Sequence, residues 1–161
     1  MSRSLVALLA PAVLLACQRT PSPDAETVRR AIEARNASAE RWYLAGHADS
    51  LATLFADDVW QMLPNMAPLV GRDSLRAFWT TAVRWGRWEF DLQTQDVVAS
   101  GSLAVERGRY SLKFTPGAQA PMPALEDRGS YVVLWRRDPD GQWRAVWDAP
   151  VSERPPAGAP R

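Results

Sequence analysis

Two hydrophobic periodicities follow one another along this chain, and their order is the feature that most constrains its fold. Before Gly86 the apolar residues recur mainly at helical spacing, whereas after Gly86 apolar and polar residues alternate over long stretches. Helical spacing predicts amphipathic helices that bury one stripe, and alternation predicts strands that bury one face. Helices that come first and strands that follow as a block favour an α+β fold.

The first half of the chain predicts three helices and one short strand. Residues 25–45 carry apolar residues at helical spacing and are expected to form one long helix. Residues 49–56 are expected to form a short second helix, and a third helix is expected to begin at Arg72. Residues 59–63 predict a strand that Pro64 ends, and the segment from there to residue 70 predicts a loop.

The second half predicts an antiparallel meander. The expected strands are the segment that begins at Trp88 and residues 103–114, 129–137 and 142–148. Residues 115–127 hold three prolines and predict a loop, whereas the Asp-Gly pair at 140–141 predicts a tight hairpin turn. A curved sheet of this kind, wrapped over the long first helix, leaves a cone-shaped cavity that is the default binding site.

The N-terminus predicts export. Residues 5–16 hold no polar side chain, follow the single charged residue Arg3, and end at Cys17. A short basic start, an apolar stretch and a small residue before the cut are the parts of a secretory signal peptide. A helix of about a dozen residues covers roughly 18 Å and is too short for a bilayer core of about 30 Å.

Residues 14–17, Leu-Leu-Ala-Cys, resemble the lipobox of bacterial lipoproteins, in which the cysteine is lipidated and becomes the first mature residue. The resemblance implies a signal peptide over residues 1–16, a tether over 17–24 and a domain anchored in the cell envelope. Gln18 then favours the periplasmic side of the outer membrane in a bacterium with two membranes. The alternative is a plain signal peptide with an incidental thiol. Residues 151–161 predict a disordered tail.

Charge and residue content argue against several classes of partner. Without Arg3 the chain carries 18 basic and 18 acidic side chains, and this balance argues against nucleic acid or polyanions as partners. Cys17 is the only cysteine and His47 the only histidine, whereas zinc normally takes several such ligands together. We find no phosphate-binding glycine loop and no Gly-x-Ser-x-Gly elbow. The sequence therefore predicts no nucleic acid, no metal and no cofactor.

Several short segments share one family pattern. They are residues 46–58, 71–76, 108–110, 129–131 and 140–143. Their order and spacing resemble the nuclear transport factor 2-like superfamily, and most closely its SnoaL-like and ketosteroid-isomerase-like bacterial branch. The resemblance covers residues 25–150 and implies three helices on a curved, mainly antiparallel sheet that forms a cone-shaped cavity. It does not fix an activity, because this fold hosts isomerases, dehydratases, cyclases, binding modules and oligomerisation domains.

The residues that the isomerases of this superfamily use are changed here. The resemblance places the catalytic aspartate of the first strand on Leu63 and the hydrogen-bonding acid of a later strand on Val133. The tyrosine of the first helix maps near Glu40. Ketosteroid isomerase chemistry is therefore not expected.

Polar and aromatic side chains on the predicted cavity face form the candidate site. Strand parity taken from the family directs Val146 and Asp148 into the cavity. Glu40 and Asp148 are the predicted catalytic pair, because a carboxylate buried among aromatic rings has a raised pKa and can act as a general acid or base. The alternative is that each carboxylate holds a fixed partner. The predicted ligand-binding residues are Tyr43, Trp60, Trp79, Glu106, Tyr110, Tyr131 and Trp135.

Three functions stay open at this stage. The first is a lipid-anchored envelope domain that binds a small apolar or amphipathic molecule in an aromatic-lined cavity. The second is an isomerase, lyase or cyclase that uses Glu40 or Asp148 as its base. The third is a homodimerisation or interaction module that uses the outer face of the sheet. The alternating polar residues Arg107, Arg109, Ser111 and Lys113 argue against large apolar burial on that face.

Overall fold

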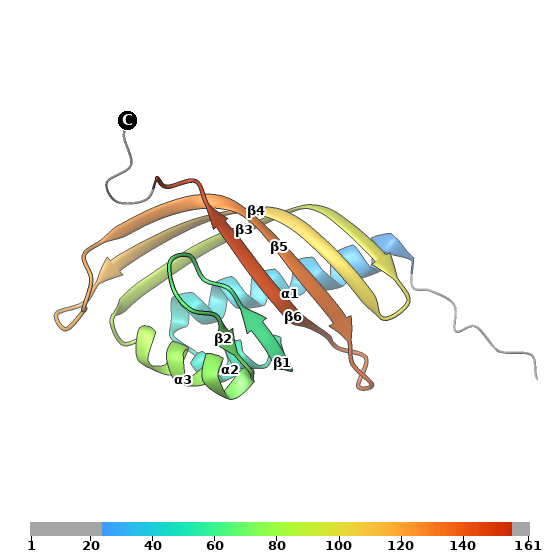
Figure 1. The fold of residues 1–161 in the computed structure, drawn as a ribbon, viewed down its shortest axis with the longest axis horizontal. Helices are drawn as coiled ribbons and strands as arrows, with labels where there is room; N and C mark the ends of the chain where they lie inside the picture. Colours follow the sequence, from blue (N-terminus) through green and yellow to red (C-terminus); the bar gives the residue numbers. More distant parts are fainter. Residues whose placement is uncertain (1–23, 156–161) are drawn as a thin grey trace, which may run out of the picture.

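The computed structural model describes residues 24–155, so the predicted signal peptide, Cys17 and the end of the predicted tail lie outside it. A curved sheet covers three helices (Figure 1), namely α1 (Ala25–Ala45), α2 (Ala48–Ala52) and α3 (Arg72–Ala82). The predicted α+β architecture is confirmed. No helix within the described range is both long and apolar enough to span a membrane.

The sheet has six strands in the spatial order β2-β1-β6-β5-β4-β3. Their bounds are β1 (Phe55–Gln61), β2 (Leu69–Val70), β3 (Gly86–Ser100), β4 (Leu103–Pro116), β5 (Leu125–Arg137) and β6 (Trp143–Ser152). Neighbouring strands are antiparallel except β1 and β6, which run parallel. The long strands β3 to β6 form the predicted meander, and α1 lies along its concave side (Figure 1).

Several predicted boundaries are wrong. The second helix ends at Ala52 instead of residue 56, because the chain there already pairs with β6 as β1. The two-residue strand β2 lies in the predicted loop. Strand β5 begins inside the other predicted loop, where Leu125 pairs with Phe114, and β6 continues to Ser152, which pairs with Gly129. Cross-strand pairing, which local sequence does not reveal, sets these strand ends.

Helix α1 buries one stripe of side chains against the sheet. The buried residues Val28, Ile32, Ala39 and Tyr43 recur at helical spacing, as predicted. Asn36 lies on the same stripe and is the only polar residue among the buried ones of this helix. A buried amide needs hydrogen-bond partners, so Asn36 marks the place where the core contains a polar site.

Two glycines let tyrosine rings lie across the neighbouring strand. Gly108 on β4 pairs with Tyr131 on β5, and Tyr110 on β4 pairs with Gly129 on β5. A Cβ atom on Gly108 would overlap the ring of Tyr131, and one on Gly129 would crowd the ring of Tyr110. The Gly-x-Tyr sequence in each strand therefore places both rings on the concave face, where they line a cavity.

A bulge in β6 changes which residues face inward. Trp135 pairs with Ala145, whereas Leu134 pairs with Trp147, so Val146 is an extra residue in the strand. Ala145 and Asp148 both line the cavity, and Val146 does not. The prediction that Val146 faces the cavity is wrong, because strict alternation assumes a strand without an inserted residue.

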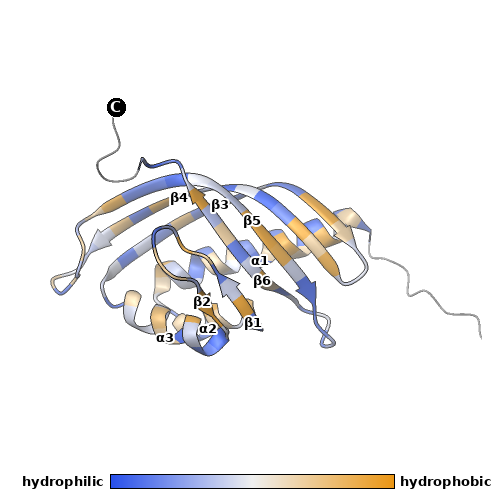
Figure 2. Cartoon of the chain, in the orientation of Figure 1, coloured by the Kyte–Doolittle hydropathy of each residue, from blue (hydrophilic) through white to orange (hydrophobic). Residues whose placement is uncertain are grey.

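The outer face of the sheet has a polar part and an apolar row. Arg107 and Lys113 point outward from β4 as predicted. Consecutive cross-strand partners also form an apolar row that crosses the whole sheet: Val98, Val105, Leu134, Trp147, Trp60 and Val70. Figure 2 shows hydrophobic and hydrophilic segments alternating along the long strands. The predicted polar character therefore applies to only part of this face, and the homodimer hypothesis stays a prediction.

Candidate functional site

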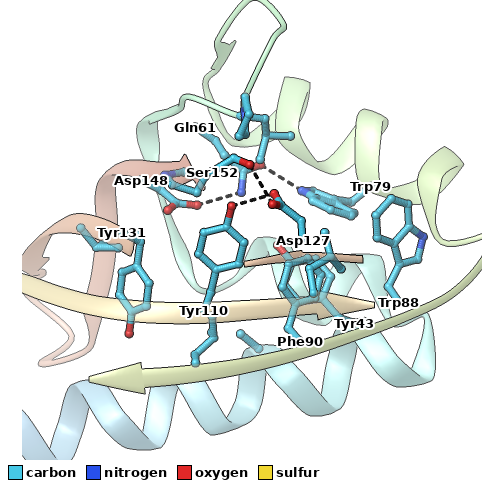
Figure 3. Close-up of a pocket in the computed structure, with 18 of the residues that line it drawn as sticks. Tyr43, Gln61, Trp79, Trp88, Phe90, Tyr110, Asp127, Tyr131, Asp148 and Ser152 are labelled. Carbon is cyan, nitrogen blue, oxygen red and sulfur yellow. Dashed lines mark hydrogen bonds between the residues drawn. The ribbon is translucent and has the colours of Figure 1, made fainter. Parts of the chain in front are cut away.

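A cavity of about 910 Å³ lies between the concave face of the sheet and helices α1 and α3. Aromatic rings dominate its wall, and several contact one another (Figure 3). The ring centroids of Tyr43 and Trp79 are 4.6 Å apart, and those of Tyr43 and Phe90 are 4.3 Å apart. The volume falls in the range of about 300–1,000 Å³ that small-molecule sites occupy. The sequence-predicted cavity is therefore present.

Asp148 is the carboxylate most open to this cavity. Its Oδ2 accepts a hydrogen bond of 2.9 Å from Nε2 of Gln61, and Oε1 of Gln61 accepts one of 3.0 Å from the indole of Trp79 (Figure 3). Gln61 is only 2% exposed, so this chain of hydrogen bonds fixes its amide. The carboxylate of Asp148 makes no other hydrogen bond within residues 24–155.

The surroundings of Asp148 change its acidity. Burial raises the pKa of Asp148 to about 6; the hydrogen bond from Gln61 opposes this rise, and the charge of Glu106 adds to it. Burial also raises the pKa of Tyr43 far above its usual value, and the charge of Asp148 adds to that rise. At neutral pH the cavity therefore holds a charged carboxylate, which can accept a proton, and a protonated phenol, which can donate a hydrogen bond.

Glu106 lies behind the cavity wall and is 0% exposed. Its Oε1 accepts hydrogen bonds from Asn36 (2.7 Å), Thr94 (2.6 Å) and the hydroxyl of Tyr131 (2.7 Å). Its Oε2 accepts one of 2.9 Å from the indole of Trp135. Glu106 does not line the cavity. The predicted placement of Glu106 in the ligand-binding wall is therefore wrong, because its carboxylate instead binds three residues of the wall, Asn36, Tyr131 and Trp135.

Asp127 forms a second polar cluster in the wall. Its Oδ2 accepts a hydrogen bond of 2.9 Å from Tyr110, and its Oδ1 accepts bonds from Ser152 (2.7 Å) and the backbone of Arg128 (2.8 Å). These contacts join β4, β5 and β6. Sequence analysis missed Asp127 because it placed this residue in a loop. The available signal was its alternation with Gly129 and Tyr131.

Two predicted site residues lie elsewhere. Glu40 accepts a hydrogen bond of 2.7 Å from the backbone N–H of Leu92 and does not line the cavity. Trp60 is 47% exposed on the outer face, because the strand pleat directs its neighbours Val59 and Gln61 inward. The predicted pair of Glu40 and Asp148 is therefore not formed, and Glu40 holds a fixed partner instead.

The other predicted residues come together in one wall. Those that line the cavity are Tyr43, Trp79, Tyr110, Tyr131, Trp135 and Asp148. Sequence analysis did not predict Gln61, Trp88 and Phe90, which complete the aromatic part of the wall and its hydrogen bonds. Gln61 was missed because its neighbour Trp60 was expected to face the cavity, which would have directed Gln61 to the opposite face of the strand.

The fold and its cavity can be compared with known proteins. A family model of the SnoaL-like domain matches residues 28–146. The chain belongs to this family. The SnoaL-like domain places it in the nuclear transport factor 2-like superfamily, as the sequence resemblance implied. A comparison with curated proteins gives no significant match.

Solved structures resemble the SnoaL-like domain in fold. One is a candidate scytalone dehydratase from Novosphingobium aromaticivorans, with 18% identity and a TM-score of 0.71 over 84% of this chain and 97% of that one. Another is a ketosteroid isomerase-like protein from Erwinia carotovora, with 18% identity and a TM-score of 0.67 over 78% and 96%. A nuclear transport factor 2-like protein from Salmonella enterica has 14% identity and a TM-score of 0.70 over 86% and 100%.

Two positions to which the sequence resemblance assigns the isomerase acids are apolar in this SnoaL-like domain. Leu63 and Val133, where the resemblance places the isomerase acids, both line the cavity. The acidic group of the cavity is therefore carried at other positions of the wall, by Asp148 and Asp127. Within residues 24–155, no group of three or more His, Cys, Asp or Glu side chains is placed to hold a metal ion.

Proposed function

We propose that this SnoaL-like domain binds a small amphipathic molecule in its cavity. The observation that carries the proposal is a cavity of about 910 Å³ whose largely aromatic wall contains a carboxylate with a single protein hydrogen bond. The apolar body of the ligand packs on rings such as Trp79, Trp88 and Phe90, and its polar group binds Asp148. Contact with aromatic rings supplies most of the affinity, and Asp148 supplies orientation.

Native mass spectrometry of the chain, purified without detergent, tests this proposal. We expect a co-purified small molecule, or uptake of one from a lipid extract. In the variant Ala39→Leu the added bulk enters the cavity from α1, and binding should fall sharply. Ala34→Leu, on the exposed side of the same helix, is the matched control. Equal binding by both variants would locate the ligand outside the cavity.

A second candidate function is proton transfer to and from a bound substrate. Two related structures are named for an isomerase and a dehydratase, and Asp148, with its pKa raised to about 6, has the acidity of a general base at neutral pH. The neutral phenol of Tyr43 can donate a hydrogen bond to the same substrate.

Hydrogen exchange on the bound molecule tests this second function. In D2O, catalysis would raise the mass of the co-purified molecule by incorporation of deuterium at carbon, and Asp148→Asn would abolish the gain. If the mass of the ligand does not change in D2O, catalysis is contradicted and only the binding function is retained.

We also propose that Cys17 anchors the domain to the cell envelope through a lipid. The support is the signal-like segment before Cys17, which lies outside the described residues. Labelling with a radioactive fatty acid tests the anchor in a bacterium that expresses the chain. We expect label and membrane association for the natural chain and neither for Cys17→Ser.

A further inference from the structure

The hydrogen-bond donors of the inner cavity wall are largely taken by the protein itself. The indole of Trp79 donates to Gln61, and that of Trp88 donates to the carbonyl of Ala82. The same holds for the side chains that face Glu106 and Asp127: Asn36, Tyr110, Tyr131, Trp135 and Ser152. A ligand that brings only acceptors, such as a ketone or a carboxylate, therefore finds few donors there besides the hydroxyl of Tyr43 and the guanidinium groups of Arg35 and Arg154.

Asp148, in contrast, has hydrogen-bond acceptor sites that the protein leaves unfilled. Its Oδ2 has one donor, Gln61, and its Oδ1 has none among the residues that the structure describes. A carboxylate carries about four acceptor sites. Leaving such a group partly unpaired in a wall of aromatic rings is unfavourable, and a donor brought by the ligand removes that penalty.

We propose that the cavity binds an amphipathic amine whose ammonium group donates to Asp148. The proposal rests on the proposed function and names its ligand class. An ammonium group supplies up to three donors and a charge opposite to that of the carboxylate. The neighbouring rings add to this preference, because a cation is attracted to the faces of tyrosine and tryptophan. Tyr43 and Trp79, whose centroids are 4.6 Å apart, supply these rings on the side of Gln61.

The charged groups of the wall agree with this polarity except at two arginines, Arg35 and Arg154. Asp127 and Asp148 line the cavity, and Glu106 lies directly behind it, so a cation meets negative charge from β4, β5 and β6. Arg35 also lines the cavity, and its Nε is buried without a hydrogen-bond partner. Its Nη2 donates to the carbonyl of Thr53 at 2.9 Å, which directs it toward α2. An anionic ligand would have to bind Arg35 or Arg154, and the experiment below includes that outcome.

Three probes of equal length test the proposal: octylamine, 1-octanol and octanoate. Titrations of the full chain would follow the fluorescence of the wall tryptophans and the heat of binding. We expect octylamine to bind about tenfold more tightly than 1-octanol and octanoate to bind most weakly, since one charge-assisted hydrogen bond accounts for a difference of that size. Octanoate equal to or tighter than octylamine would overturn the proposal and point to Arg35 or Arg154.

Two variants separate the site from general charge. Asp148→Asn should reduce octylamine affinity to that of 1-octanol and leave 1-octanol unchanged. Asp96→Asn removes the same charge from the outer face of β3 and should leave the amine preference intact. Binding of 1-octanol without an amine preference would overturn only the ligand class. Failure of all three probes to bind would overturn the proposed function as well.

Discussion

Two carboxylates of this domain, Glu106 and Asp148, lie on the same face of the sheet, each opposite Val133 on β5, and have contrasting partner sets. Glu106 is fully buried and receives four hydrogen bonds, from Asn36, Thr94, Tyr131 and Trp135. Asp148 faces the cavity and receives one, from Gln61. Burial alone does not identify a functional acid. The number of acceptor sites that the protein leaves unfilled identifies it, because a carboxylate whose sites are all filled has none left for a ligand.

The largest expected effect comes from breaking the saturated site. Glu106→Gln keeps the shape of the side chain but turns a donor toward groups that are themselves donors. We expect a loss of about 3 kcal/mol in the free energy of unfolding, because buried donors lose their acceptor. Urea denaturation measures it, with the exposed Glu126→Gln as the control. A loss no larger than that of the control would show that the network does not stabilise the fold.

The second prediction concerns the pH dependence of stability at Asp148. Its pKa is about 6 in the folded state and 3.8 as the reference value for the unfolded chain. Between these values the folded state binds more protons, so stability must fall as pH rises from 4 to 7. The burial of the carboxylate costs about 3 kcal/mol well above pH 6 and nothing below the unfolded pKa.

Denaturation at pH 4 and pH 7.5 measures this effect. Asp148→Asn should remove most of the fall. Three ionisable groups interact electrostatically with Asp148 from the elements packed around it: Glu106 on β4, Tyr43 on α1 and Tyr131 on β5. None is removed by the substitution, so an unchanged pH slope in Asp148→Asn would assign the effect to another group.

A smaller effect is expected at the glycine that accommodates one of the donors to Glu106. Gly108→Ala places a methyl group against the ring of Tyr131 and should displace its hydroxyl from Glu106. We expect a loss of about 1–2 kcal/mol, as is usual for overpacking in a core. Urea denaturation measures it. The variant Tyr131→Phe keeps the ring and removes only the hydroxyl, so it separates the effect of the hydroxyl from that of the ring position. Full stability of Gly108→Ala would mean that the ring has room to move.

The smallest effect is expected at Glu40. Glu40→Gln retains an acceptor for the N–H of Leu92 and loses only the charge of the hydrogen bond. We expect a change below about 1 kcal/mol and no change in ligand affinity. Thermal unfolding and the octylamine titration check both points. A large loss of affinity would return Glu40 to the site in which the sequence placed it.

The sequence by itself determined the elements and their class. Helical spacing over residues 25–45, the alternation after Gly86 and the Asp-Gly turn at 140–141 each depend on a few neighbouring residues, so the α+β fold and the meander were predictable. The wall residues Tyr43, Trp79, Tyr131 and Asp148 followed from the same patterns, combined with the family resemblance.

Only the tertiary structure decided which of two adjacent faces a side chain takes and what it meets there. The extra residue Val146 reverses the alternation of β6, and the pairing of β1 directs Trp60 outward. Glu40 and Glu106 look equally suited to a cavity, but one binds a strand backbone and the other is enclosed by four donors. These outcomes depend on contacts between residues far apart in the chain, and no local pattern encodes them.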